Sequence, residues 1–280
     1  MNGAFPLLSD PDYITYIGPL SIRGANPTTH LAEVRYPVQA APIISVVKAM
    51  PPTGLLACNE AIAWLLLRAT GLPSPRNAGV MTLTESKAIK VLGRKALPAA
   101  LVHEGHVLMW AAQKLDFSSI KALFAGTKGD ARWLALLKTV QGAAIAAFDE
   151  ALLNLDRNTG NVLYISADAC APIDHELSFG TQDWIHHNLL HLPTDGDSLR
   201  TLKHGVASGK LAISAYAEAL NRMVFHAERH GQALQACSAH IADFLSRVFP
   251  DQHEEMTERV LSFIAARTAQ QWIKDRLGVV

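Results

Sequence analysis

The sequence is most informative where it reads Asn154-Leu155-Asp156-Arg157-Asn158-Thr159-Gly160-Asn161, and again further on at Ile173-Asp174-His175. Asn161 follows Asp156 by five residues, and Asp174 follows it by 18. An Asp and an Asn at this spacing suit a loop that turns both side chains to the same side. Asp174 follows a short β-like segment, so the pattern predicts that a strand brings a second carboxylate to the same place.

These three side chains fit the transfer of a phosphoryl group from Mg·ATP. That reaction needs a carboxylate near the attacking hydroxyl and oxygen ligands for Mg²⁺ at the phosphates. Asp156 is the candidate that accepts or orients the hydroxyl, and Asn161 and Asp174 are the candidate metal ligands. The alternative is that Asn, Asp and Gly only form a turn between a helix and a hairpin. The three residues together are more specific than any one of them.

The N-terminal part supplies a possible partner for this loop. The strand-like run Ser45-Val46-Val47 ends in Lys48, and Glu60 follows 12 residues later on a predicted helix. A lysine in this setting resembles the one that contacts ATP phosphates in kinases, and Glu60 is placed to pair with it. The alternative is a surface lysine on a strand edge and a solvated glutamate.

Five short motifs follow one another along the chain. They are Val47-Lys48, Asn59-Glu60, Thr70-Gly71-Leu72-Pro73-Ser74-Pro75, the segment 154–161, and Ile173-Asp174-His175. In this order they resemble the HipA-like kinases, most closely the branch of small stand-alone proteins, over roughly residues 14–185. The resemblance implies a protein-kinase-like fold, Mg·ATP binding between two lobes, and Ser/Thr protein kinase activity.

The same resemblance implies a role for each matching residue. Lys48 contacts phosphate, Asp156 is the catalytic base, and Asn161 and Asp174 bind Mg²⁺. The segment 154–161 also resembles the corresponding loop of phosphoinositide kinases. The acceptor, a protein or a small molecule, therefore stays open.

The remaining ATP-binding residues leave weaker signals. The phosphate loop is not a regular G-x-G-x-x-G, and Gly24 is the best candidate for close backbone approach to phosphate, although a hairpin turn explains it equally well. The hinge that reads adenine through its backbone is expected near 108–111, with Met109 and Ala111 as the ATP-binding residues.

Two departures from the related kinases concern the loop itself. Asn158 stands where relatives often carry His, and Gly160 stands where HipA carries Lys. A missing cation removes one stabiliser of the charge on the transferred phosphoryl group, and Arg157 or Arg23 is a candidate substitute. These departures also favour an alternative function, that of a pseudokinase that binds nucleotide as a sensor or scaffold. A small-molecule kinase on the same fold is a further alternative.

Gly and Pro residues separate the predicted strands and helices, which are mainly strands in the first part of the chain and mainly helices in the second. We therefore predict an α+β, bilobed protein-kinase-like fold with an N-lobe over 1–110 and a C-lobe over 111–280. The pattern predicts one helix at 55–70, a long helix from Asp130 to about 153, and three helices over 208–277. Strands are predicted at 13–17, 31–36, 43–49, 78–83, 107–111, 162–166 and 169–173.

Composition excludes several classes of protein. With 25 basic and 25 acidic residues the net charge is +0, which gives no reason to expect nucleic acid or an acidic membrane as a partner. The three cysteines are far apart and odd in number, which favours a reducing compartment. No signal peptide or membrane-spanning segment is apparent, so a cytoplasmic location is expected.

Histidines offer a competing signal. His175, His186, His187 and His191 form the densest group, and His187 and His191 are placed to share a helix face, as metal ligands do. No carboxylate completes a familiar metal motif there. Structural or surface histidines are the favoured interpretation, except for His175, which belongs to the motif around Asp174.

Overall fold

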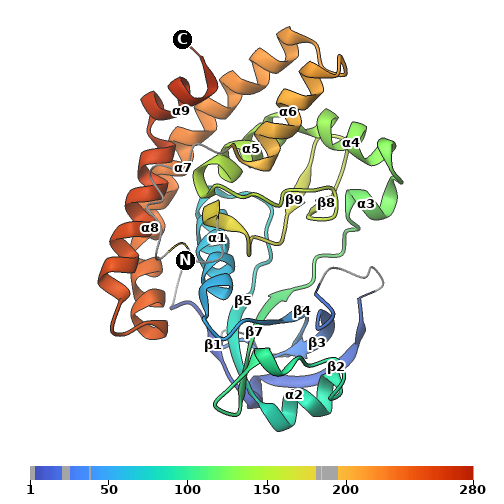
Figure 1. Ribbon diagram of the computed structural model, residues 1–280, viewed down its shortest axis with the longest axis vertical. Helices are drawn as coiled ribbons and strands as arrows, with labels where there is room; N and C mark the ends of the chain where they lie inside the picture. Colours follow the sequence, from blue (N-terminus) through green and yellow to red (C-terminus); the bar gives the residue numbers. More distant parts are fainter. Residues whose placement is uncertain (1–3, 21–25, 38, 181–183, 185–194, 280) are drawn as a thin grey trace. The chain divides into compact units, whose positions relative to one another are not determined.

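The chain forms two compact units. The computed structural model describes residues 4–20, 26–37, 39–180, 184 and 195–279. The first unit, called here the sheet unit, consists of Asn2–Trp64 and Pro75–Asp116. The second, called the helical unit, consists of Leu65–Ser74 and Phe117–Val280. The protein is therefore α+β, with a large sheet in one unit and most of the helices in the other (Figure 1).

The sheet unit is built on a seven-stranded sheet, as far as the described residues show. The strands run in the order β1-β5-β7-β4-β3-β2, and β6 pairs with β7. All pairs are antiparallel except β1 with β5. The strands are β1 (Leu7–Leu8), β2 (Tyr13–Pro19), β3 (His30–Val34), β4 (Ile43–Met50), β5 (Ala78–Thr84), β6 (Val102–His103) and β7 (His106–Gln113).

Side-chain alternation explains how this sheet forms its core. In β3 the buried side chains of His30, Ala32 and Val34 alternate with half-buried ones, as expected for a strand with one face turned to the core. Val47 and Ala49 of β4 belong to the same apolar cluster. The helix α2 (Glu85–Leu92) follows β5 directly and packs on this sheet. β4 lies between β3 and β7, so it is an inner strand.

The helix α1 spans Leu55–Thr70, the bounds predicted from the sequence. It ends before Gly71, whose φ of 73° lies in the left-handed region that glycine adopts without strain. The boundary between the two units falls within this helix, after Trp64.

Helices dominate the second unit. Its elements are α3 (Ile120–Leu123), α4 (Thr127–Leu137), α5 (Val140–Leu152), the hairpin β8 (Val162–Tyr164) and β9 (Cys170–Pro172), α6 (Asp197–Ala207), α7 (Ile213–Val248), α8 (His253–Thr268) and α9 (Gln270–Leu277). Every residue of α5 from Gly142 onward is buried. This helix packs against α6, α7 and α8, so it forms the centre of the unit (Figure 1).

The prediction of one long helix from Asp130 to about 153 is wrong, because the chain breaks between α4 and α5. Asp130 lies within the first turn of α4 and does not cap it. Thr139 caps α5, its hydroxyl accepting the N–H of Gly142 at 3.1 Å. A Cβ at Gly142 would lie 1.9 Å from the carbonyl oxygen of Leu136, so only glycine allows the two helices to meet this closely.

The other predicted elements are present with small shifts of their ends. The strands predicted at 13–17, 43–49, 78–83 and 107–111 lie inside β2, β4, β5 and β7, and the one at 31–36 overlaps β3. The hairpin strands are shorter than predicted, and the three C-terminal helices are α7, α8 and α9. The short strands β1 and β6 and the helices α2, α3 and α6 were not predicted.

Cys58, Cys170 and Cys237 are all buried free thiols, so no disulfide links the chain. Burial raises the pKa of Cys170 to about 12, and that of Cys237 to about 11, so both stay protonated at neutral pH. Within the part of the chain that the structure describes, no helix is both long and apolar enough to cross a membrane.

Candidate functional site

The segment 154–161, called here the Asp156 loop, begins directly after α5. Leu153 ends that helix in a left-handed conformation with φ of 48°. The N–H of Asn154 then donates to the carbonyl of Asp149 at 2.8 Å, and the side chain of Asn154 accepts the N–H of Asp156 at 3.0 Å. The loop therefore leaves the buried end of α5 in a defined direction.

The carboxylate of Asp156 is held by two side chains of its own loop. Nδ2 of Asn161 donates to Oδ2 at 3.0 Å, and also to the Asp156 carbonyl at 2.8 Å. Nδ2 of Asn158 donates to Oδ1 at 2.8 Å. The amide nitrogen of Asn161 is thus used twice, whereas its Oδ1 accepts no hydrogen bond from a described residue. An amide oxygen in this position suits a hard cation such as Mg²⁺.

Asp174 comes to the same place through the β8–β9 hairpin. Val162 and Pro172 are partners in that hairpin, and the N–H of Ile173 donates to the carbonyl of Asn161 at 3.0 Å. Asp174, the next residue, therefore leaves the hairpin beside Asn161. Its φ of 60° lies in the left-handed region, which is uncommon for a residue other than glycine.

Arg157 holds the loop and the hairpin together. Its guanidinium is buried and donates from Nε to both carboxylate oxygens of Asp149 at 3.2 Å. Nη1 donates to the carbonyls of Asn161, at 2.8 Å, and Ile173. Nη2 donates to Asp149 at 3.1 Å and to Nδ1 of His175 at 2.9 Å. Nε, Nη1 and Nη2 of Arg157 are thus all engaged in this network. Arg157 is therefore not available as the cation that replaces the missing one at the phosphates, and the prediction that it could do so is wrong.

Asp149 is the counter-ion of Arg157 and is itself fully buried. The hydroxyl of Ser198 in α6 also donates to it. Burial raises the pKa of Asp149, and the Arg157 guanidinium opposes that shift. Asp149 is not among the predicted site residues, although an Asp-Glu pair near the end of an otherwise apolar helix is a recognisable signal. Glu150, the other member, is buried and pairs with Arg267 at 3.1 Å.

A further carboxylate, Asp197, lies at the start of α6 beside the Asp156 loop. Its N–H donates to the Asn154 carbonyl at 3.0 Å, and its side chain accepts the backbone N–H of Arg157. Burial is the main cause that raises the pKa of Asp197, and Asp156 raises it further, while Arg200 opposes the shift. Asp197 therefore fixes the loop from the side of α6, which the sequence alone did not indicate.

In the sheet unit, Lys48 of β4 and Glu60 of α1 form an ion pair with 2.8 Å between Nζ and Oε1. The pair is buried, with side chains 9% and 4% exposed. The pairing predicted from their spacing is confirmed. The alternative of a lysine on a strand edge is wrong, because β4 is an inner strand. Their role in binding ATP stays a prediction.

Met109 and Ala111 lie in the middle of β7. Met109 is opposite Ala49 of β4 and Met81 of β5, and Ala111 occupies the equivalent position one pleat further on. Both are buried, and both have strand neighbours on either side. The chain leaves the sheet only after Gln113, and the unit ends at Asp116. The segment 108–111 is thus not where the chain passes from one unit to the next.

Several predicted residues lie outside the described part of the chain. These are Gly24 and Arg23 of the candidate phosphate loop, and His186, His187 and His191 of the histidine group. His175 is described, and its Nδ1 accepts a hydrogen bond from Arg157. The histidine next to Asp174 is therefore bonded to the Asp156 loop.

No protein-family model matches the sequence, and no curated protein is significantly similar to it. The roles of the residues above therefore rest on their chemistry and their geometry.

Proposed function

We propose that the protein is an ATP-dependent phosphotransferase, with the sheet unit and the helical unit as the two lobes of a protein-kinase-like fold. It transfers the γ-phosphate of Mg·ATP to a hydroxyl, and a Ser or Thr side chain of a protein is the leading acceptor. One observation carries the proposal. The carboxylate of Asp156 is oriented by Asn161, and the hairpin that begins after Asn161 returns to Asp174 beside it.

The donor set fits the metal that this reaction requires. Mg²⁺ prefers oxygen ligands and keeps several waters, so one carboxylate and one amide oxygen are enough from the protein. Asp174 and Oδ1 of Asn161 would hold the ion. When bound, Mg²⁺ neutralises negative charge on the phosphate oxygens.

The chain's own residues have separate tasks in the transfer. The acceptor oxygen forms a bond to the γ-phosphorus, while the bond from that phosphorus to the bridging oxygen of ADP breaks. Asp156 orients the hydroxyl and receives its proton, and ADP leaves with the bonding electron pair. Lys48, held by Glu60, contributes positive charge to the phosphates of ATP.

The test is the melting temperature with and without Mg·ATP. Ligand at 100 times its dissociation constant stabilises a fold by ~2.7 kcal/mol, which is easily measured. We expect a magnesium-dependent rise in the wild type that Asp174→Asn abolishes. Asp168→Asn, the same change in the turn of the same hairpin, is the matched control and should keep the rise. Absence of any rise at millimolar nucleotide would contradict the proposal.

A second candidate, a pseudokinase that binds nucleotide without transferring phosphate, is favoured by one contact. Asn158 donates to Oδ1 of Asp156 while Asn161 donates to Oδ2, so both oxygens of the candidate base already accept hydrogen bonds. Incubation with labelled ATP and a panel of protein and metabolite acceptors separates the two functions. Labelled product establishes a kinase and its acceptor class, whereas binding without product establishes the sensor.

A further inference from the structure

Asn158 and Gly160, the two positions at which the Asp156 loop departs from the related kinases, are in contact with one another. The backbone N–H of Gly160 donates to Oδ1 of Asn158 at 2.8 Å. An Asn side chain that accepts the N–H two residues later forms an ordinary loop turn. This turn differs at the other end of the amide, because Nδ2 of Asn158 donates to Oδ1 of Asp156 at 2.8 Å. The side chain at 158 therefore reaches the candidate base.

The contact with Gly160 decides which way the amide of Asn158 points. A backbone N–H can only donate, so it must meet the oxygen of the amide and not its nitrogen. Nδ2 is thereby turned toward Asp156, whose ionised carboxylate can only accept. The reversed amide would set donor against donor at Gly160 and acceptor against acceptor at Asp156. Both neighbours of the amide thus require the same orientation.

Glycine is required at position 160 for a steric reason. A Cβ there would lie 2.9 Å from Oδ1 of Asn158, closer than such atoms approach without a bond. The backbone itself does not require glycine, because the φ of Gly160 lies outside the left-handed region. Among the described residues, the other atom near such a Cβ is Cδ of Lys121, at an ordinary contact distance of 3.7 Å. A side chain at 160 would therefore displace the amide of Asn158 and little else.

Packing does not hold the side chain of Asn158 in place. The residue is exposed, and it lines a cavity of about 330 Å³ beside the Asp156 loop. The two hydrogen bonds of the amide are consequently what fixes it. Substitution of an exposed side chain usually changes stability little. The effect of position 158 on the reaction can therefore be measured in a folded protein.

The carboxylate of Asp156 has one donor on each oxygen. Nδ2 of Asn161 donates to Oδ2 at 3.0 Å, and Nδ2 of Asn158 donates to Oδ1. Two donors on opposite sides restrict the rotation of the carboxylate about its Cβ–Cγ bond. An ionised carboxylate offers about four lone-pair sites, so sites remain for an acceptor hydroxyl. The two contacts thus orient Asp156 and still leave it able to accept a hydrogen bond.

We propose that Asn158 is a positioning residue for Asp156, and that position 160 is glycine to leave room for its amide. This role rests on the proposed phosphoryl transfer. Asn158 takes up no proton in it and acts only by orienting the carboxylate. A catalytic group contributes most when its geometry is set before the substrate arrives. The two departures from the related kinases are accordingly one linked arrangement.

The first test changes the donor and keeps the shape. Asn158→Asp retains an oxygen for the N–H of Gly160 and places a second oxygen against the carboxylate of Asp156. We expect kcat for the transfer of labelled phosphate to fall at least about tenfold, the worth of one hydrogen bond to a charged group. KM for ATP and the melting shift with Mg·ATP should not change. Asn221→Ala, at an exposed position of α7, is the control for Asn158→Ala, which should lose a similar factor.

The second test is a double-mutant cycle. Gly160→Ala should lower kcat about as much as Asn158→Ala does, because the new Cβ displaces the amide. In the Asn158→Ala background, the same change at Gly160 should have no further effect, because no amide remains to be displaced. Losses that simply add would mean that Gly160 acts by another route, and they would overturn the proposal.

The side-chain amide NMR signals of Asn158 give a readout that does not depend on activity. These signals are assigned by their loss in Asn158→Ala. They should move in Asp156→Ala, which removes the acceptor of Nδ2, and in Gly160→Ala, which displaces Oδ1. Signals that stay in place in both variants would mean that the amide makes neither contact, which overturns the proposal.

The outcomes separate this role from the proposed function. A wild type that binds Mg·ATP and labels no acceptor of the panel contradicts the transfer, and the role of Asn158 falls with it. An active wild type with full turnover in Asn158→Asp contradicts the role alone. A rise of turnover in Asn158→Ala would also overturn it, because the contact would then block the base and not position it.

Discussion

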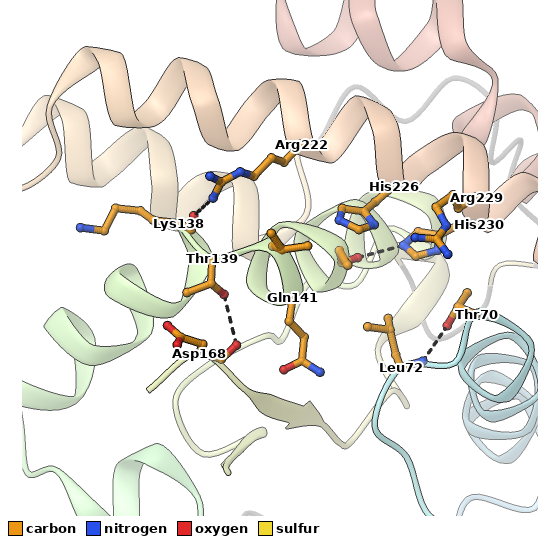
Figure 2. Close-up of a pocket in the computed structure, with 12 residues that line it drawn as sticks. Thr70, Leu72, Lys138, Thr139, Gln141, Asp168, Arg222, His226, Arg229 and His230 are labelled. Carbon is orange, nitrogen blue, oxygen red and sulfur yellow. Dashed lines mark hydrogen bonds between the residues drawn. The ribbon is translucent and has the colours of Figure 1, made fainter. Parts of the chain in front are cut away.

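The Asp156 loop follows the end of the buried helix α5, and a cavity of about 630 Å³ lies at the start of the same helix (Figure 2). The buried polar atoms of these two regions differ in one respect. In the loop, the guanidinium of Arg157 is fully used by Asp149, His175 and two carbonyls. Among the residues that line the cavity, Nδ1 of His230 and the first N–H groups of α5 have no partner in the part of the chain that the structure describes. Satisfied polar groups fix a conformation, whereas a buried polar atom without a partner costs free energy in the folded state.

The largest expected effect is on the chemistry of the loop. Asp156→Ala should lower turnover by about 10²- to 10⁴-fold, the usual contribution of a general base, while the melting shift with Mg·ATP persists. Asp168→Ala serves as the control for removing a carboxylate from the same unit. Unchanged turnover in Asp156→Ala would exclude it as the base.

The next effect tests whether Arg157 holds the loop. Arg157→Met leaves the buried carboxylate of Asp149 without its counter-ion, so we expect the free energy of unfolding to fall by about 3–5 kcal/mol in urea titrations. Arg200→Gln is the control, because it removes an exposed partner of Asp197 and should cost at most about 1 kcal/mol. If the two variants lost equal stability, Arg157 would not be the centre of the network.

The cavity should respond to pH instead. The pKa of His230 is lowered to about 4 in the folded protein, below the ordinary value of 6.5, so the unfolded chain binds the proton more tightly. The stability that the neutral ring contributes is therefore complete above pH 6.5 and is lost as the pH falls toward 4, by about 3 kcal/mol in all. Urea titrations across this interval should show a smaller loss in His230→Phe than in the wild type. An identical pH dependence would mean that His230 does not titrate as described.

The smallest effect concerns the helix that the two regions share. Thr139→Ala removes the cap of α5, and we expect a loss of about 1 kcal/mol in the free energy of unfolding. Thr139→Ser keeps the hydroxyl and should restore most of that loss. A loss of equal size in both variants would assign the role of Thr139 to its methyl group and not to the cap.

The sequence predicted those features that depend on local patterns. The alternation of apolar side chains indicated most of the strands, and helical spacing with Gly71 at the end gave α1 its bounds. The pairing of Lys48 with Glu60 followed from a strand and a helix of predictable length. Asp174 can come close to Asp156 and Asn161 if a hairpin returns the chain to the Asp156 loop, and this hairpin is present.

What the sequence could not predict depends on contacts between distant segments. The break between α4 and α5 interrupts a pattern that continues without a gap, and its cause is the close approach of Gly142 to Leu136. The spacing of His226 and His230 is as visible as that of His187 and His191, yet only the carbonyl of Ala144 reveals which nitrogen of His230 is free. Likewise, the sequence gives no sign that Arg157 is paired, and only the structure shows its ion pair with Asp149.

The position of the unit boundary inside α1 has a consequence for synthesis on the ribosome. Leu65, Leu66 and Leu67 are at most 2% exposed, and they belong to the helical unit although they are made well before Phe117–Val280. Domains tend to fold as their last residues emerge, and apolar surface that waits for later residues favours aggregation. A fragment truncated at Asp116 would contain the whole sheet unit, and it would also carry these three leucines without the rest of the unit to which they belong. A single cut in the chain therefore cannot separate the two units.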